Sequence, residues 1–337
     1  MLTSILRRAR MLLGSKCPSS DPVFGRIDLQ FCRAQYLVRF YYLASVFISY
    51  LMIPEIHSIA KESAAWDFLW PVAWLSAFKA SDIVEWISVA SLAASMLAFQ
   101  FPANRLSRVL FAVLFLLTVA IENSQGAMDH AYHAWLWICI CFVFLPRLRS
   151  TGALPRVVKM AYLTVIASTQ TLILLFYSIA GFWKVFQGLK PLLQGTEGNF
   201  APRGLALQLA DRMLTTGTSP LLGDFAVANY WLIWPMFLFL IYVQLVAVLV
   251  ALRPRLHIAW GYILIIFHIG TWLLMEIEFP EHVLLLGLLF VMSPFRPRQW
   301  NFRDVLSDLP GFGLLVRLLG PMQSRERGAL GRAYSAR

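Results

Sequence analysis

Charged residues are scarce in this sequence, and their scarcity excludes an ordinary soluble domain. Asp, Glu, Lys and Arg together make up 14% of the 337 residues, whereas 59% are hydrophobic. A soluble domain usually carries about 25% charged residues. Several apolar runs approach or exceed the roughly 20 residues that a helix needs to cross a bilayer. The composition therefore predicts an integral membrane protein.

Cysteines and familiar catalytic motifs are also scarce. Two of the four cysteines precede the first apolar run and two lie inside a later one, so they predict neither a disulfide framework nor a paired CxxC zinc site: Cys17, Cys32, Cys139 and Cys141. No HExxH motif, GxSxG elbow or Gly-rich phosphate loop is present. No internal repeat and no soluble domain at either end are found, and no cleaved signal peptide is expected.

The apolar segments predict an all-α, polytopic bundle of about eight transmembrane helices. We place the spans near residues 36–54, 83–101, 106–121, 131–146, 160–183, 230–252, 256–275 and 282–295. Together they form one transmembrane domain, 36–295, between a basic segment, 1–35, and a basic tail, 296–337, part of which favours a membrane-surface helix. The stretch 66–78 is short and contains Pro71, so we expect an interfacial or re-entrant helix there.

The charge distribution predicts the orientation of this bundle. If both termini are cytoplasmic, the inner segments hold 23 of the 29 Lys and Arg residues, whereas 13 of the 18 acidic residues lie outside. Cytoplasmic loops of membrane proteins carry this excess of positive charge. Contact with an anionic leaflet explains the net charge of +11 without nucleic acid as a partner. We expect a multi-pass protein of the cell membrane.

Ionisable residues beside the spans are the first candidates for function in a membrane protein. One group precedes the fourth span and contains Asp129, His130, Tyr132 and His133. His130 and His133 are three residues apart, so they share a face on a helix. Asp129 can orient an imidazole by accepting its N–H. The alternative interpretation is a polar helix start, at which a negative charge is favourable.

A second group, with Tyr177 and Lys184, closes the fifth span. Lys184 is either an anchor that snorkels to the lipid headgroups or a partly desolvated amine that can act as a base. The small residues Ala180 and Gly181 allow a neighbouring helix to approach closely and to bury the lysine. Both interpretations place this group at the outer side of the membrane.

A third group lies in and after the seventh span. His268 sits about two turns inside the outer end of that span, and Gln244 of the sixth span is a candidate partner, because a buried polar group needs one. The glutamates in 276–281 are interpreted as ordinary outer-loop acidity. We predict that His130, Lys184 and His268 converge in one pocket. The histidine spacing is also compatible with a metal, but no metal site is assigned.

In this order, the three groups resemble the motifs of the vitamin K-dependent gamma-carboxylase-like membrane domain, also called the horizontally transferred transmembrane (HTTM) domain. That family has an Asn-His-x-Tyr-Leu motif, which Asp129-His130-Ala131-Tyr132 resembles. Its Tyr-x-x-Ala-Gly-x-x-Lys motif matches 177–184 at every fixed position. Its Phe-His and Phe-Pro pairs correspond to Phe267-His268 and Phe279-Pro280. The resemblance covers about residues 31–296.

The resemblance implies a carbon–carbon lyase of the carboxylase/epoxidase type that uses a reduced naphthoquinone of the vitamin K type. Lys184 would be the base that deprotonates the quinol, and His130 would support the charged intermediate. The pocket for a quinone or lipid-like ligand would be lined by Asp129, Tyr132, His133, Tyr177, His268 and Gln244. An apolar quinol reaches such a site through lipid, and a dry pocket protects reactive intermediates from water.

Several departures from the family pattern shape this prediction. Trp183 stands where animal carboxylases carry a second lysine, Asp129 replaces an asparagine and His133 replaces a leucine. The lumenal domain that docks protein substrates in animal enzymes has no counterpart here, so we expect epoxidation to survive more readily than carboxylation. One alternative is a non-enzymatic protein of immunity, export or assembly. Another is a transporter or metal-binding protein, which the nearly uncharged centres of spans two, three and six disfavour.

Overall fold

The computed structural model describes residues 22–62, 66–78, 80–126, 130–148, 154–195, 198–297 and 302–311, and this part of the chain is helical without strands. Its α-helices are α2 (Pro22–Glu62), α3 (Ala80–Gln100), α4 (Arg105–Glu122), α5 (His133–Val143), α6 (Arg156–Leu193), α7 (Gly204–Thr216), α8 (Gly223–Ala228), α9 (Tyr230–Leu245), α10 (Ala247–Val250), α11 (His257–Met275), α12 (Pro280–Leu286) and α13 (Phe302–Asp308). A 3₁₀ helix, Ala73–Ala77, precedes α3, and a π-helix, Gly287–Val291, continues α12. Helices satisfy their own backbone hydrogen bonds, as an apolar chain in lipid requires.

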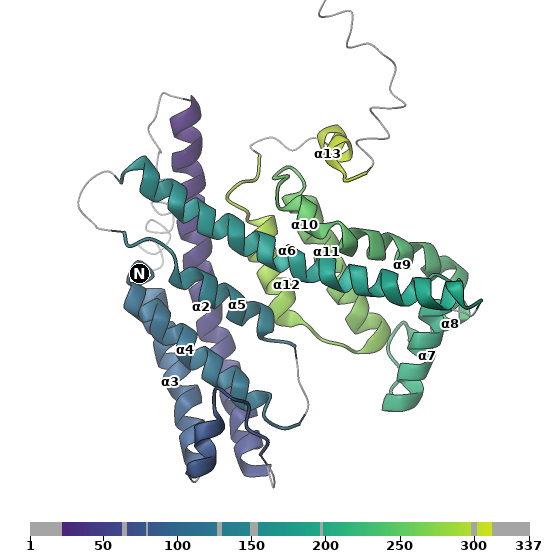
Figure 1. The fold of residues 1–337 in the computed structure, drawn as a ribbon, viewed down its shortest axis with the longest axis horizontal. Helices are drawn as coiled ribbons and strands as arrows, with labels where there is room; N and C mark the ends of the chain where they lie inside the picture. Colours follow the sequence, from purple (N-terminus) through teal and green to yellow (C-terminus); the bar gives the residue numbers. More distant parts are fainter. Residues whose placement is uncertain are drawn as a thin grey trace, which may run out of the picture.

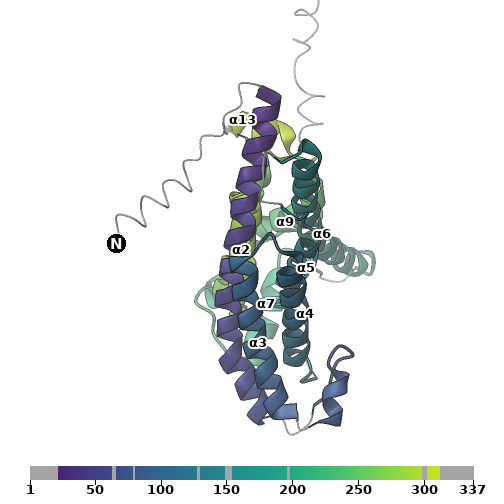
Figure 2. The same cartoon turned by 90° about the vertical axis from the view of Figure 1, so that its left-hand side faces the viewer.

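Helices α2 to α5 form one packed group (Figures 1 and 2). Its core is aromatic, because Tyr41 stacks on Trp135 with ring centroids 4.9 Å apart and packs edge-on against Phe142. Tyr41 donates a hydrogen bond to the Trp135 carbonyl at 2.9 Å, and the Trp135 indole donates to Ser45 Oγ at 2.9 Å. These polar groups are therefore buried with partners, which avoids the cost of burying them unpaired.

Helix α6 connects this group with the second one, which contains α7 to α12. Figure 1 shows α6 running across the molecule from one group to the other. Near its start, Tyr162 packs edge-on against Phe31 of α2, with centroids 5.2 Å apart. Further along, α6 packs on α9 and α10. With 38 residues, α6 is longer than the roughly 20 residues of one bilayer crossing.

Four helices of the described part are long and apolar enough to cross a membrane: Arg26–Lys61, Ile83–Gln100, Arg156–Pro191 and His257–Met275. Shorter apolar helices occupy His133–Val143, Tyr230–Leu245 and Pro280–Val291. Helix α4 has 18 residues but carries three charged ones. The all-helical membrane class expected from the composition is therefore confirmed. Each of the eight expected spans overlaps a helix of the described part, but only these four helices qualify by length and composition, so the count of eight stays a prediction.

The stretch 66–78 differs from the expected interfacial or re-entrant helix. Within it only Ala73–Ala77 is helical, because Pro71 has no N–H to donate to a preceding helical turn. Ser124, just after α4, holds the rest of the stretch. Its carbonyl accepts a hydrogen bond from Asp67 N, and its hydroxyl accepts one from Leu69 N, both at 3.1 Å.

Two expected spans contain irregular backbone, and α6 compensates for both irregularities. The span 230–252 breaks into α9 and α10, and Ser178 Oγ of α6 accepts the N–H of Val248 at 2.8 Å. The last span ends in the π-helix, and Gln170 of α6 donates to the Leu289 carbonyl of that π-helix. Side chains of neighbouring helices commonly satisfy freed backbone groups in this way inside membranes.

The basic ends of several helices meet at one end of the molecule, drawn at the top of Figure 1. Lys159 at the start of α6 pairs with Asp28 at the start of α2, at 2.7 Å. Arg33 of α2 donates to the carbonyl of Arg296, past the last span, at 3.2 Å. Helix α13, in the tail, lies at the same end. Residues 298–301 and 312–337 of the basic tail and the first 21 residues lie outside the described residues.

Arg108, in the first turn of α4, is fully buried. Its guanidinium donates to the carbonyl of Pro102 at 2.9 Å and to the carbonyl of Leu145, just past α5. The side chain thereby ties the turn between α3 and α4 to the end of α5. Two carbonyl partners lower the cost of placing this cation inside the protein.

Candidate functional site

Lys184 lies on a face of α6 that the rest of the protein covers. Gly181 and Gly188, one turn before it and one turn after it, share this face. A β-carbon on Gly181 would lie 2.4 Å from the backbone nitrogen of Leu245 at the end of α9, and one on Gly188 would lie 2.8 Å from the Phe200 ring. The two glycines therefore allow close approach on both sides of the lysine, as the sequence predicts for Gly181.

The amine of Lys184 is partly buried and has no hydrogen bond or ion pair within the part of the chain that the structure describes. Its backbone carbonyl accepts a hydrogen bond from Asn199 Nδ2 at 3.3 Å, which fixes the loop over this face. The neighbouring Trp183 is 57% exposed, and it lies about 100° further around the helix. The motif thus separates an outward tryptophan from an inward lysine.

Tyr177 and His268 form a buried hydrogen-bonded pair between α6 and α11. The Tyr177 hydroxyl lies 2.6 Å from Nε2 of His268, and both side chains are buried. Nδ1 of His268 is buried without a partner among the described residues. Tyr177 precedes Lys184 by seven residues, so the two side chains lie on one face of α6, about 10 Å apart along its axis.

His282 and Glu281, at the start of α12, extend this pair to a cluster. The His282 ring packs against His268 with centroids 5.2 Å apart, and its Nδ1 lies 2.9 Å from Oε1 of the buried Glu281. The Phe279 ring packs against both imidazoles, with centroids 5.2 Å from that of His268 and 5.3 Å from that of His282. The sequence interpretation missed this role for Glu281 and treated it as outer-loop acidity. Pro280 as the first helical residue is the signal that places Glu281 and His282 in a helix start.

His130 and His133 form a second pair, at the start of α5. Their Nδ1 atoms lie 3.1 Å apart, and the His130 side chain is exposed. Tyr132, directly before the helix, is partly buried, and Asp129 lies outside the described residues. One turn after His133, Trp137 packs against Phe176 of α6 with centroids 6.3 Å apart. Only His133 of this pair belongs to α5, and His130 lies three residues before the helix, so the expected shared helix face is not formed.

The predicted partnership between Gln244 and His268 is wrong. Tyr177 is the hydrogen-bond partner of His268, and the buried Oε1 of Gln244 has no partner among the described residues. The reason is the close approach at Gly181, which sets Gln244 against α6. Within the described residues, no hydrogen bond or ring contact joins Lys184, His130 and His268 directly to one another. The structure instead has the pair of His130 with His133, the pair of Tyr177 with His268, and the separate amine of Lys184.

Acid–base chemistry is what this arrangement can perform. A tyrosine, two imidazoles and a carboxylate in mutual contact can hold or transfer protons. In the described part, no group of three His, Cys, Asp or Glu side chains is placed to hold a metal ion, and Cys32, Cys139 and Cys141 are free.

No family model matches the chain, and comparisons with curated proteins and with solved structures found no match either. The function is therefore inferred from the site and its motifs.

Proposed function

We propose that this protein is a membrane-embedded enzyme of the carboxylase/epoxidase type that acts on a reduced quinone from the bilayer. One observation carries the proposal: the covered face of α6 holds the unpartnered amine of Lys184 two turns from the buried pair of Tyr177 and His268. A snorkelling anchor would extend from a lipid-facing position. The neighbouring Trp183 holds that position, whereas Lys184 faces protein.

The residues at this face fit a reduced quinone. Nδ1 of His268 is buried without a partner in the described chain, and the amine of Lys184 also lacks one. Both groups are suited to bind the hydroxyl groups of a quinol. The rings of Phe267 and Phe279 pack against the His268 ring, with centroids 4.9 and 5.2 Å away, and supply aromatic surface. When bound, a quinol would supply the ring that reacts with oxygen.

In this proposal Lys184 is the base that accepts a proton from a quinol hydroxyl. Tyr177 and His268 orient the substrate, and the resemblance to the carboxylase-like domain assigns His130 as an electrostatic helper. Burial favours such a reaction, since water exclusion strengthens local electrostatics and protects reactive species. The chain acts on a substrate that arrives from lipid and therefore needs no soluble domain for this step.

The test is oxygen-dependent conversion of a reduced naphthoquinone to its epoxide and water by membranes that contain the protein. We expect Lys184→Ala to abolish epoxide formation while expression and membrane insertion stay unchanged. Lys190→Ala is the matched control, because Lys190 is an exposed lysine on the same helix. Activity in the control variant shows that the effect belongs to residue 184 and not to the loss of any lysine from α6.

Two results would contradict this function. Wild-type membranes that form no epoxide from several quinols would favour the non-enzymatic interpretation, in which the bundle serves immunity, export or assembly. Equal epoxide from wild type and Lys184→Ala would leave the enzyme in place but remove Lys184 as its base. Product identification by mass spectrometry distinguishes the epoxide from a simply oxidised quinone.

We also infer that eight helices cross the cell membrane and that both termini are cytoplasmic. Basic helix ends meet at one end of the molecule, through the contacts of Lys159 with Asp28 and of Arg33 with the Arg296 carbonyl. Tryptophans favour the membrane–water interface. Six of the seven exposed tryptophans among the described residues, all except Trp137 within α5, belong to segments near the side assigned as outer: Trp70, Trp74, Trp86, Trp183, Trp231 and Trp272.

The shortest of these helices, α5, has 11 residues and a length of about 16 Å. It packs on α4, α6 and α12, and most of its side chains are buried, so it need not match the bilayer by itself. Alkaline phosphatase fusions test the topology. Fusions after Arg149 and Arg255 should be inactive, and fusions after Gly126 and Gly217 should be active. Activity after Arg255 would refute the eight-span arrangement.

A further inference from the structure

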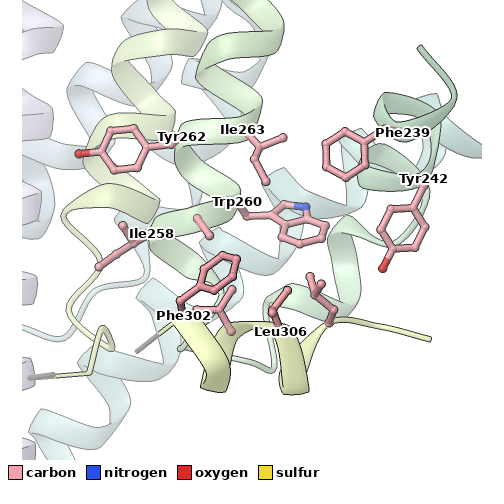
Figure 3. Close-up of a pocket in the computed structure, with 11 residues that line it drawn as sticks. Phe239, Tyr242, Ile258, Trp260, Tyr262, Ile263, Phe302 and Leu306 are labelled. Carbon is pink, nitrogen blue, oxygen red and sulfur yellow. The ribbon is translucent and has the colours of Figure 1, made fainter. Parts of the chain in front are cut away.

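A large apolar cavity lies between α9, α11 and α13. Its volume is about 640 Å³, and its wall consists almost entirely of apolar atoms. Figure 3 shows Trp260 of α11 facing Phe239 and Tyr242 of α9, with Phe302 and Leu306 of α13 on the opposite side. This cavity is an open groove and not an enclosed void, because Phe239, Tyr262 and Phe302 in its wall are each more than half exposed. An exposed apolar groove is typical of a surface that binds an apolar ligand or lipid.

The chemistry of the wall favours an apolar occupant over ordered water, because an ordered water needs two to four polar partners and this wall is apolar. Two polar groups of the wall already have partners. Tyr242 donates its hydroxyl to the Pro310 carbonyl at 2.6 Å, and the Trp260 indole donates to the Val243 carbonyl at 3.2 Å. An apolar chain matches this wall, and the bilayer supplies acyl chains.

Arginines stand beside this cavity, in the turn between α10 and α11. Arg253 donates to the carbonyl of Asp308, the last residue of α13. Arg255 lies 3.6 Å from the Asp308 carboxylate, and its side chain is 56% exposed. The long, exposed contact leaves the Arg255 guanidinium donors for another anion. Arginine is the side chain best suited to bind phosphate oxygens.

We propose that the cavity binds one acyl chain of an anionic phospholipid whose phosphate lies against Arg255. Three features support this site. The cavity wall is apolar, the exposed guanidinium of Arg255 lies beside it, and the short helix α13 forms one wall. Such a lipid would stabilise α13 against α9 and α11, because its chain contacts all three helices. The site is distinct from the face of Lys184 and does not depend on the proposed enzymatic activity.

The experiment is native mass spectrometry of purified protein after addition of phosphatidylglycerol or phosphatidylcholine at equal concentration. We expect the wild type to retain one phosphatidylglycerol in preference to phosphatidylcholine. Arg255→Ala should weaken phosphatidylglycerol binding about tenfold, the loss expected for one charge-assisted hydrogen bond, and leave phosphatidylcholine binding unchanged. Ala259→Phe should reduce binding of both lipids, because Ala259 lines the cavity. Ile266→Phe, at an exposed site on α11 beyond the cavity, is the control and should bind as the wild type does.

A phosphatidylglycerol with a photoreactive acyl chain gives a second measurement that needs no variant. Crosslinks in the wild type should map to residues that line the cavity: Phe239, Tyr242, Ile258, Ala259, Trp260, Tyr262, Ile263, Phe302, Val305, Leu306 and Leu309. Crosslinks elsewhere, or equal lipid retention by the wild type and Ala259→Phe, would overturn the site. Equal binding of both lipids that Arg255→Ala does not change would overturn the assignment of the anionic headgroup.

Discussion

Replacing Gly181 with alanine should force α6 and α9 apart. A β-carbon at residue 181 would lie 2.4 Å from the Leu245 nitrogen and 2.7 Å from the Gln244 carbonyl carbon. Ordinary van der Waals contact begins at 3.4 Å. Both neighbouring atoms belong to the helix backbone, so no side chain can rotate away. The two helices must separate by about 1 Å, which a closely packed interior resists.

The magnitude follows from comparison with Gly270. Overpacking costs about 1–3 kcal/mol, whereas alanine stabilises a helix interior by about 1 kcal/mol relative to glycine. A β-carbon on Gly270 of α11 meets nothing within 4 Å, so Gly270→Ala gains helix propensity without overpacking. The propensity gain is common to both variants and cancels. Gly181→Ala should therefore be less stable than Gly270→Ala by about 1–3 kcal/mol.

The assay is reversible unfolding in mixed micelles by titration with sodium dodecyl sulfate, followed by circular dichroism. If quinol epoxidation is detected, Gly181→Ala should also reduce it, because Lys184 lies one turn from the substituted residue. Gly270→Ala should retain activity. Equal free energies of unfolding for the two variants would refute the close approach of α6 and α9, and with it the protein cover over Lys184.

Three further substitutions test individual contacts by the same titration. Tyr177→Phe should lower the free energy of unfolding by about 1–3 kcal/mol, because the buried Nε2 of His268 loses its partner. The control Tyr262→Phe, at a half-exposed ring, should leave the free energy of unfolding nearly unchanged. Arg108→Ala should lower the free energy of unfolding by about 1.5–3 kcal/mol, because the carbonyls of Pro102 and Leu145 lose their donor. An equal loss in Arg105→Ala, at an exposed arginine, would refute the role of these two hydrogen bonds. Ser178→Ala should increase hydrogen exchange at the amide of Val248, and unchanged protection would contradict its hydrogen bond.

Helix positions can be predicted from the sequence because apolarity acts locally. The expected spans 83–101 and 256–275 differ from α3 and α11 by a few residues at most. Contacts between helices are a different matter. Tyr177 and His268 are 91 residues apart, and hydropathy does not specify which faces of two helices meet. Gln244 is a reasonable partner by depth alone, but packing at Gly181 places it elsewhere.

The start of α12 shows a similar limit. Glu281 and His282 follow an expected outer loop, and acidic residues are common there. Only tertiary packing reveals that this first helical turn lies against α11, where His282 contacts His268. The seven-residue spacing of Tyr177 and Lys184, by contrast, does carry usable information. Because seven residues make about two helical turns, the spacing alone predicts that both side chains share one face of a helix.

Helix α6 gives the strongest argument that Lys184 acts on something outside the protein. Its buried polar side chains all have protein partners: Thr169 donates to Val165, Gln170 to the π-helix, Tyr177 bonds His268 and Ser178 accepts from Val248. The covered amine of Lys184 differs, since it has none in the described chain. A partly buried amine without a protein partner is typical of a functional residue in a membrane protein. A substrate or ligand that enters beside Tyr177 would be the missing partner.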